Sequence, residues 1–180
     1  MQSVIKYYPS LCIRILLCFI PISVFYTIFL PLTIKGTALF LLPYHPVIVD
    51  NLLIMRNYGF EFVEACIATA AYYLLWCLVM LTKDITIIMR IKMIGTSFVL
   101  FLAMNIIRII MLILLALYST QEIFDVVHLV FWQLIAGVYV AAVWFFVVRV
   151  YKVKSIPMYD DIGYFYKHSF FKKSRNRIRG

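Results

Sequence analysis

The sequence predicts an all-α integral membrane protein, and two observations support this prediction. Hydrophobic residues make up 65% of the 180 residues and charged residues only 14%, with a mean hydropathy of +0.98. Soluble domains are typically about half apolar and about one quarter charged. Several apolar runs also exceed the roughly 7–15 apolar residues of a cleaved signal peptide. We therefore expect one membrane domain, residues 1–150, followed by a basic tail, residues 151–180.

About four segments are long enough to cross a bilayer, which takes about 20 apolar residues. They cover residues 11–34, 63–82, 93–117 and 126–149. Pro21 and Pro31 are expected to bend the first span, which membrane helices tolerate when neighbours satisfy the freed carbonyl groups. A fifth apolar segment, residues 36–53, would place a basic loop or the basic tail outside the cell. We interpret it as a lid or re-entrant loop.

The basic residues predict the orientation of these spans. Lys and Arg flank the first span, occupy the loop between the second and third, and follow the fourth, whereas the opposite loops hold most of the acidic residues. The positive-inside rule therefore places both termini in the cytoplasm. The net charge of +9 comes mostly from the tail. A basic juxtamembrane tail suits anionic lipid headgroups, so a nucleic-acid partner is not expected.

A short hairpin is predicted over residues 51–66, directly before the second span. Two apolar stretches flank the segment from Arg56 to Gly59, where Asn57 and Gly59 supply turn geometry. We expect this extracytoplasmic hairpin to lie over the outer mouth of the helix bundle and to lead the chain into Cys66.

The four cysteines do not predict a metal site or another cofactor. Cys12, Cys18 and Cys77 lie within apolar runs, where a thiol behaves as a small hydrophobic side chain. None forms a C-x-x-C pair or a Cys/His cluster with zinc spacing. Cys66 differs, because it is expected in the first turn of the second span, where a helix N-terminus and a nearby cation favour the thiolate. A buried structural cysteine and a nucleophile remain open as interpretations of Cys66.

Arg108 lies in the most apolar part of the chain. A charge at that depth costs a few kcal/mol, so such residues usually face the bundle interior and serve a function. Arg108 is about ten residues, roughly 15 Å, from the outer end of its span, which is a long reach for snorkelling. Asn105 lies on the same helical face and is expected to orient it. The alternative is a structural Arg108 that fixes a pair of helices.

His128 is expected in the first turn of the fourth span, with Asp125 as its N-cap and Trp132 one turn further on. By itself, His128 is equally well interpreted as an ordinary interfacial histidine. The predicted orientation, however, places Cys66, Arg108 and His128 in one layer at the outer face. A thiol, a guanidinium and an imidazole together supply a nucleophile, an oxyanion stabiliser and a general acid–base for acyl transfer.

The EAC sequence before the second span, NIIR in the third and the histidine that opens the fourth resemble the exosortase/archaeosortase family over roughly residues 45–135. Members of that family are polytopic membrane cysteine transpeptidases. They process precursors that carry a C-terminal signal made of a short motif, a membrane helix and a basic tail. The resemblance implies that Cys66 is the nucleophile, Arg108 the oxyanion or thiolate partner, and His128 the acid–base. It also implies the plasma membrane of an archaeon or bacterium, with an extracytoplasmic site.

The chain departs from the family pattern in two respects. Many members follow the cysteine with a Ser/Thr-Gly pair, whereas Ile67 and Ala68 follow Cys66 here. Thr69 is the first hydroxyl after the cysteine, and we keep it as a supporting candidate together with Trp132. The chain is also short and resembles the compact archaeal members.

The predicted function is cleavage of the C-terminal sorting signals of membrane-anchored precursor proteins at the extracytoplasmic face. The acyl product would pass to water or to a lipid or cell-envelope acceptor. Small residues that offer a groove for a substrate helix are Ala68, Ala70, Ala71, Gly137 and Ala141. Ordinary internal helix packing explains these small residues equally well.

Two other functions remain open. The first is a non-enzymatic membrane scaffold or assembly factor, in which the intramembrane polar residues are structural. The second is an enzyme that acts on lipid, with His45 as an outer-face base. The prolines that flank His45 more simply indicate a rigid turn.

Overall fold

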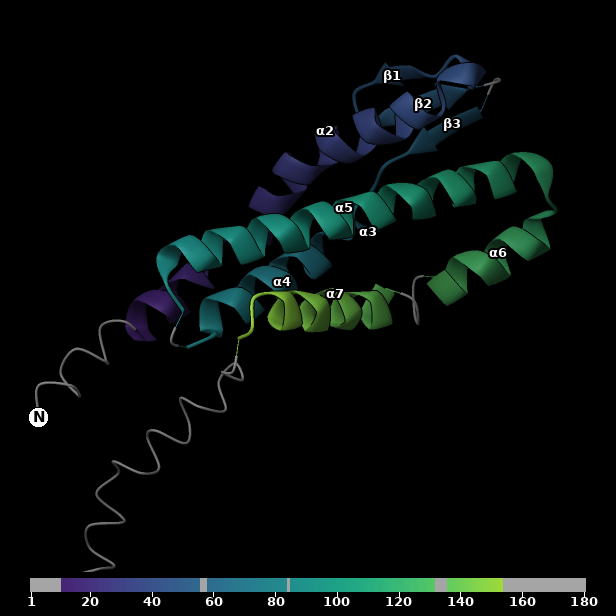
Figure 1. Ribbon diagram of the computed structural model, residues 1–180. Helices are drawn as coiled ribbons and strands as arrows, with labels where there is room; N and C mark the ends of the chain where they lie inside the picture. The colour runs from purple at the N-terminus through teal and green to yellow at the C-terminus, as the bar shows by residue number, and fades with distance from the viewer. Residues whose placement is uncertain (1–10, 56–57, 84, 132–135, 154–180) are drawn as a thin grey trace, which may run out of the picture.

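The computed structural model describes residues 11–55, 58–83, 85–131 and 136–153. Within these ranges the chain is mostly helical, with one small sheet at one end (Figure 1). The helices are α2 (Ile22–Phe40), α3 (Glu64–Ile67), α4 (Thr69–Leu81), α5 (Ile87–Tyr118), α6 (Gln121–Val130) and α7 (Ala136–Val150). The remaining elements are the 3-10 helix η1 (Leu42–Tyr44) and the strands β1 (Val47–Val49), β2 (Leu52–Met55) and β3 (Tyr58–Glu61). The prediction of a mostly helical fold is confirmed.

The first predicted span consists of two helices. Residues 11–17 are helical, and α2 begins after Pro21, which has extended backbone and no side-chain cap. Proline lacks an N–H and fixes its own φ, so it suits a helix start better than a helix interior. Pro31 lies inside α2, as expected, and α2 continues beyond residue 34 to Phe40.

The longest helix is α5, which has 32 residues and runs along most of the molecule (Figure 1). It starts six residues before the predicted third span, residues 93–117, because Thr86 caps it by accepting a hydrogen bond from the Met89 N–H at 3.3 Å. α5 packs against α2, α4 and α7 along its length and against α6 near its end. It is therefore the central element of the bundle.

The second predicted span, residues 63–82, is not one continuous helix. Ala68 has φ 57° and ψ 44° and separates α3 from α4. Its N–H donates to the Glu64 carbonyl at 3.0 Å, which closes α3 after one turn. In the fourth predicted span, residues 126–149, the structure describes α6 and α7, and residues 132–135 lie outside the described residues.

The predicted hairpin is present and belongs to a three-stranded antiparallel sheet with the order β1-β2-β3. Met55 pairs with Tyr58 across the turn, whose residues 56 and 57 lie outside the described residues. Leu53 and Met55 are buried and alternate with exposed Ile54, as expected for a strand with one covered face. The segment interpreted as a lid, residues 36–53, comprises the end of α2, η1, β1 and the start of β2, and β1 was not predicted.

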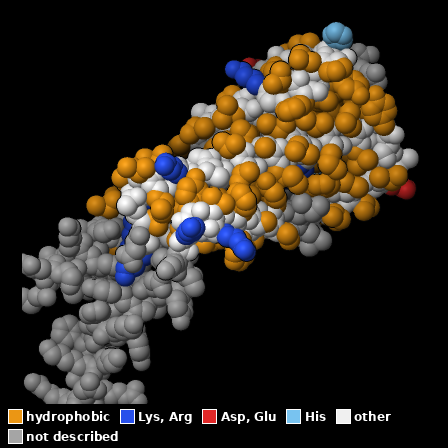
Figure 2. Space-filling view, in the orientation of Figure 1, with side chains coloured by type: hydrophobic (Ala, Val, Ile, Leu, Met, Phe, Trp, Pro, Cys, Tyr) orange, Lys and Arg blue, Asp and Glu red, His pale blue; other side chains and the backbone are white. Residues whose placement is uncertain are grey.

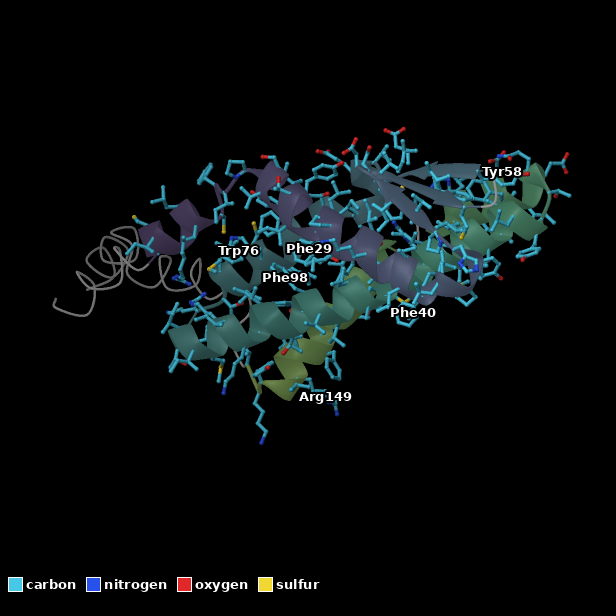
Figure 3. All side chains as sticks on the ribbon, turned by 90° about the horizontal axis from the view of Figure 1, so that it is seen from above. Phe29, Phe40, Tyr58, Trp76, Phe98 and Arg149 are labelled. Carbon is cyan, nitrogen blue, oxygen red and sulfur yellow. The ribbon has the colours of Figure 1, made fainter. Side chains whose placement is uncertain are left out.

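Aromatic residues from three helices form the centre of the bundle. Phe29 of α2 stacks on Tyr72 of α4 with ring centroids 3.6 Å apart, and Phe98 of α5 meets Phe29 edge-on at 5.2 Å. Figure 3 shows Phe29 and Phe98 together, with Trp76 nearby. At Gly36 of α2, a Cβ would lie 2.5 Å from Ile106 of α5. A larger residue at position 36 would therefore push the end of the Ile106 side chain aside, and glycine lets α2 and α5 approach without this shift.

Two described helices, α2 and α5, are long and apolar enough to cross a membrane, and the apolar segments Thr69–Leu81 and Gly137–Val150 are shorter. Apolar side chains cover most of the visible face of the molecule, and the few blue Lys and Arg side chains stand apart from one another (Figure 2). The described part of the chain therefore presents an unusually apolar exterior.

The two ends of the bundle differ in charge. The end of α4, the start of α5 and the end of α7 meet at what we call the basic end, where Tyr151 contacts Thr96 and the Lys92 carbonyl. Its described basic residues are Arg14, Lys83, Arg90, Lys92, Arg149 and Lys152. The sheet, α3, α6 and the end of α5 form the opposite, sheet end (Figure 1). Its acidic residues are Asp50, Glu61, Glu64, Glu122 and Asp125.

Candidate functional site

Cys66 is the third residue of α3, the one-turn helix between the sheet and α4. It is half-buried, and its N–H donates to the Val63 carbonyl at 2.9 Å. The thiol makes a weak hydrogen bond at 4.0 Å to the carbonyl of Glu61, the last residue of β3. The sheet and the second span thus meet at Cys66, as the hairpin prediction implied.

The early end of α3 leaves main-chain carbonyls without helical partners, and two side chains of α5 bind them. Asn105 donates through Nδ2 to the Cys66 carbonyl at 3.0 Å and to the Ile67 carbonyl at 3.2 Å. Arg108 donates through Nη2 to the Cys66 carbonyl at 3.0 Å and to the Ala65 carbonyl at 3.2 Å. These four hydrogen bonds fix the backbone that carries the thiol.

Asn105 and Arg108 share a face of α5, as predicted, but no hydrogen bond joins them within the described ranges. Asn105 is almost fully buried, with 3% of its surface exposed, and it binds α3 directly rather than orienting Arg108. Arg108 is half-buried, and its buried Nε has no partner among the described residues. Besides the two hydrogen bonds from Nη2 to α3, the Arg108 guanidinium therefore has an N–H group at Nε that is free to donate.

A cavity of about 250 Å³ lies between α3, β3, α5 and α6. Its lining residues are Gly59, Phe60, Glu61, Phe62, Ala65, Cys66, Arg108, Ile109, Leu112, Ile113, Phe124 and His128. Cys66, Arg108 and His128 thus line one cavity, although they come from three different helices. The volume is below the roughly 300–1,000 Å³ of most small-molecule pockets and suits a side chain and a short piece of main chain.

His128 lies at the end of a helix and not at its start. It belongs to the last turn of α6, whose N-cap is Thr120. Asp125, predicted as the cap, lies inside α6 and accepts a hydrogen bond from Gln121 Nε2 at 2.9 Å. The prediction of Asp125 as the N-cap is therefore wrong, and Thr120 occupies the cap position without a capping hydrogen bond to its side chain.

The His128 side chain is exposed, and its ring centroid lies 5.5 Å from that of Phe124. It also lines a second, more open cavity of about 240 Å³ with Ala65, Asp125 and Leu129. His128 therefore stands between the Cys66 cavity and a region that is more accessible to solvent.

Two other predicted residues, Thr69 and His45, do not line either cavity. Thr69 is buried, and its hydroxyl donates to the Glu64 carbonyl at 3.5 Å. His45 is exposed and has φ 52° at the end of η1, which agrees with the rigid turn. Trp132 lies outside the described residues.

Two parts of the cavity were missed in the sequence. Residues Gly59, Phe60 and Glu61 of β3 line it, and the hairpin leading into Cys66 was the available signal. Phe124 lies four residues before His128, the spacing of neighbours on one helix face. Within the described ranges, no group of three or more His, Cys, Asp and Glu side chains could hold a metal ion.

Cys66, Arg108 and His128 are chemically able to attack a carbonyl, to stabilise an oxyanion and to move a proton. The apolar walls of the cavity would strengthen these electrostatic interactions by excluding water. No protein-family model matches this chain, and no curated protein or solved structure matches it either.

Proposed function

We propose that this chain is a membrane cysteine peptidase or transpeptidase of the exosortase/archaeosortase type. The observation that carries the proposal is the single cavity lined by Cys66, Arg108 and His128. The three residues lie on different helices, so neither local sequence nor helix periodicity requires them to meet. The resemblance of the EAC and NIIR motifs to that family agrees with this arrangement.

The apolar exterior supports placing the chain in a membrane. In the apolar 18-residue stretch of each helix, only 33% is buried in α2 and 28% in α5. A core helix of a soluble protein would be mostly buried. Large side chains such as Leu16, Val99 and Phe145 are 70%, 67% and 71% exposed. We infer four spans from the described helices, namely residues 11–40, α3 with α4, α5, and α7, of which α2 and α5 are each long and apolar enough to cross a membrane by themselves. The positive-inside rule then places the basic end in the cytoplasm and the sheet end outside.

In the proposed mechanism, His128 takes the proton of the Cys66 thiol, and the thiolate attacks the carbonyl carbon of the scissile peptide bond. The oxyanion of the tetrahedral intermediate accepts hydrogen bonds from the donors that Arg108 does not use on α3. His128 gives a proton to the leaving amine, and a thioester on Cys66 remains. Water, or an amine or hydroxyl of a lipid or cell-envelope acceptor, then gives its proton to His128 and attacks the thioester, which restores the thiol.

One observation favours the second candidate, a non-enzymatic scaffold or assembly factor. All four hydrogen bonds from Asn105 and Arg108 end on main-chain carbonyls of α3. These bonds would stabilise the broken helix in a protein without any catalytic activity. The two functions differ in their need for the Cys66 thiol. The peptidase needs it as the nucleophile, whereas the scaffold does not need it.

Replacing Cys66 tests the proposal in the native host, by following the host's membrane-anchored precursors on immunoblots. With Cys66→Ala, the precursors should accumulate uncleaved while the variant stays at its normal level in the membrane. Cys66→Ser should slow or trap the reaction, because a hydroxyl is a weaker nucleophile. Cys77→Ala, which removes another half-buried thiol, is the matched control and should process normally. Unchanged processing with Cys66→Ala would contradict the peptidase and favour the scaffold.

A further inference from the structure

One edge of the sheet faces the cavity that contains Cys66. In the order β1-β2-β3, the described part of the chain gives β3 only one neighbouring strand, β2. Residues 59–62, which comprise the end of β3 and the residue after it, line the cavity. An unpaired strand edge presents N–H and C=O groups that can pair with another extended chain.

The register of the sheet shows which main-chain groups of β3 point away from β2. Along an antiparallel pair, positions whose groups bond to the partner alternate with positions whose groups point outward. The Phe62 N–H donates to the Asn51 carbonyl at 2.9 Å. Phe62 is therefore one of the positions whose main-chain groups bond toward β2. By alternation, and in agreement with the observed pairing, the N–H and C=O groups of Gly59 and Glu61 point outward.

The position of Cys66 agrees with this alternation. The carbonyl of Glu61, which should point outward, is the group that the Cys66 thiol contacts at 4.0 Å. The Glu61 side chain accepts a hydrogen bond from Asn51 Nδ2 at 3.2 Å, so its carboxylate already has a partner on the hairpin. The thiol therefore lies beside the free edge of β3, and a chain paired with that edge would pass next to it.

We propose that the substrate polypeptide binds in extended conformation as a fourth strand on β3. Its main chain pairs with the outward groups of Gly59 and Glu61, which holds the scissile carbonyl at Cys66. This inference rests on the proposed peptidase function and adds the way in which the substrate is held.

Strand addition also determines the kind of specificity. Main-chain hydrogen bonds provide affinity without regard to sequence, and pockets select side chains at alternate positions. The apolar cavity walls, among them Phe60, Ile109 and Phe124, would accept one apolar side chain of the bound strand. Recognition would then depend on one or two residues near the scissile bond and on an extended backbone.

Disulfide exchange at Cys66 tests the inference with the purified full-length protein. The probe is acetyl-Val-Val-Val-cysteamine, joined by an amide bond, whose thiol forms a mixed disulfide with 2-mercaptoethanol; exchange attaches the probe to Cys66 and releases 2-mercaptoethanol. The control probe carries an N-methyl group on its middle amide. Both are equilibrated with the protein in a fixed concentration of 2-mercaptoethanol, and mass spectrometry measures the occupancy of the Cys66 fragment. The unmethylated probe should reach half occupancy at about tenfold lower concentration, because methylation removes a main-chain hydrogen bond and blocks the edge.

Two matched proline variants locate the binding edge. Gly59→Pro removes an outward N–H of β3, a position where an edge strand tolerates proline. Ile48→Pro is the control, because Ile48 pairs with Leu53 and by the same alternation has its N–H on the opposite edge of the sheet. The preference for the unmethylated probe should fall below twofold in Gly59→Pro and should stay near tenfold in Ile48→Pro.

Equal occupancy of the wild-type protein by the two probes would overturn the inference, and so would an undiminished preference in Gly59→Pro. The wild-type comparison needs no variant, so it decides the matter even if a proline variant does not fold. Disulfide exchange requires an accessible thiol but no catalysis. If Cys66→Ala leaves precursor processing unchanged, the peptidase proposal fails, whereas the probe preference separately decides whether the edge binds peptide.

Discussion

Arg90 and Arg108 both lie on α5 and both donate to main-chain carbonyls of the neighbouring span, but at opposite ends of the bundle. At the basic end, Arg90 binds the carbonyls of Val79, Met80 and Thr82 at 2.7–2.8 Å. At the sheet end, Arg108 makes two bonds, both through Nη2.

The difference lies in the donors that remain. Arg90 uses both of its Nη atoms on the end of α4, where the last carbonyls of a helix lack partners, and this arrangement is a structural cap. Arg108 has a buried Nε without a partner among the described residues, and its side chain lines a cavity beside a thiol. The same residue type therefore caps a helix at one end of the bundle, whereas at the other end it keeps an unused donor beside a cavity.

The largest expected effect comes from replacing His128. Among the described residues its side chain has no hydrogen bond whose loss would destabilise the fold. His128→Gln should lower the rate of precursor cleavage by about 10²- to 10⁴-fold, the usual contribution of a general acid–base. His45→Gln is the matched control, since His45 is also exposed at the sheet end, and it should cleave at the wild-type rate. Pulse-chase measurement of precursor cleavage gives both rates. Loss of less than a factor of three in His128→Gln would remove His128 from the mechanism.

Exchanging each arginine for methionine tests the comparison directly. Arg108→Met should reduce the cleavage rate per molecule by about 10²- to 10³-fold, as expected for loss of an oxyanion donor. Arg90→Met should leave that rate unchanged but lower stability, on the order of 3 kcal/mol, because three charge-assisted hydrogen bonds are lost.

The measurements for this pair are precursor cleavage normalised to the amount of folded protein, and thermal unfolding in detergent. If both variants lose only stability, Arg108 is a structural cap like Arg90, and the scaffold function gains support. If Arg90→Met abolishes cleavage at normal protein levels, the proposed division between the two ends is wrong.

Asn105 should have an intermediate effect. In Asn105→Ala the buried Ile67 carbonyl loses its side-chain donor, which costs about 1–3 kcal/mol, while Arg108 still binds the Cys66 carbonyl. Because the backbone around the thiol would be less fixed, we expect cleavage to slow by about tenfold. Alkylation of Cys66 by iodoacetamide, measured alongside cleavage, should change less than twofold. An equal loss in both assays would mean that the variant only makes the Cys66 thiol less accessible.

The smallest effect concerns the break in the second span. Ala68 has φ 57°, and the left-handed conformation costs a residue with a Cβ about 1–2 kcal/mol. Ala68→Gly should therefore stabilise the protein by about 1 kcal/mol, measured by thermal unfolding. Ala71→Gly, inside the regular part of α4, should destabilise it by about the same amount. Stabilisation by both variants, or by neither, would contradict the assigned backbone strain.

The break at Ala68 also shows where sequence-based prediction stops. The apolar runs and the asymmetric charges predicted the helical character and the two chemically different ends. Asn57 and Gly59 predicted the hairpin, although Gly59 belongs to β3 and not to the turn. Alanine is the best helix former, so nothing local marks Ala68 as a break. The break is stabilised by Asn105 and Arg108, which bind α3 from about forty residues further along the chain, and local patterns do not record such contacts.

The start of α5 and the position of His128 were misjudged for related reasons. Arg90 and Lys92 resembled a polar loop, but α5 already includes them, because the Arg90 guanidinium finds partners on α4. His128 was placed early in its helix because Asp125 has the character of a cap, whereas Thr120 fills that position. The convergence of Cys66, Arg108 and His128 on one layer was nevertheless predicted, since it depends only on the direction of each span. Their catalytic roles stay predictions.

The length of α5 has a consequence for the depth at which the chemistry would occur. Arg108 comes 16 residues after Lys92, the last basic residue near the start of α5, which is roughly 24 Å along a helix axis. The hydrocarbon layer of a bilayer is about 30 Å thick. If Lys92 marks the cytoplasmic boundary, the backbone of Arg108 lies in the outer part of that layer, and its long side chain can extend to the headgroup region, where its charge costs far less than at the bilayer centre. The thiol would then meet its acceptor close to the hydrated headgroups and not deep among acyl chains.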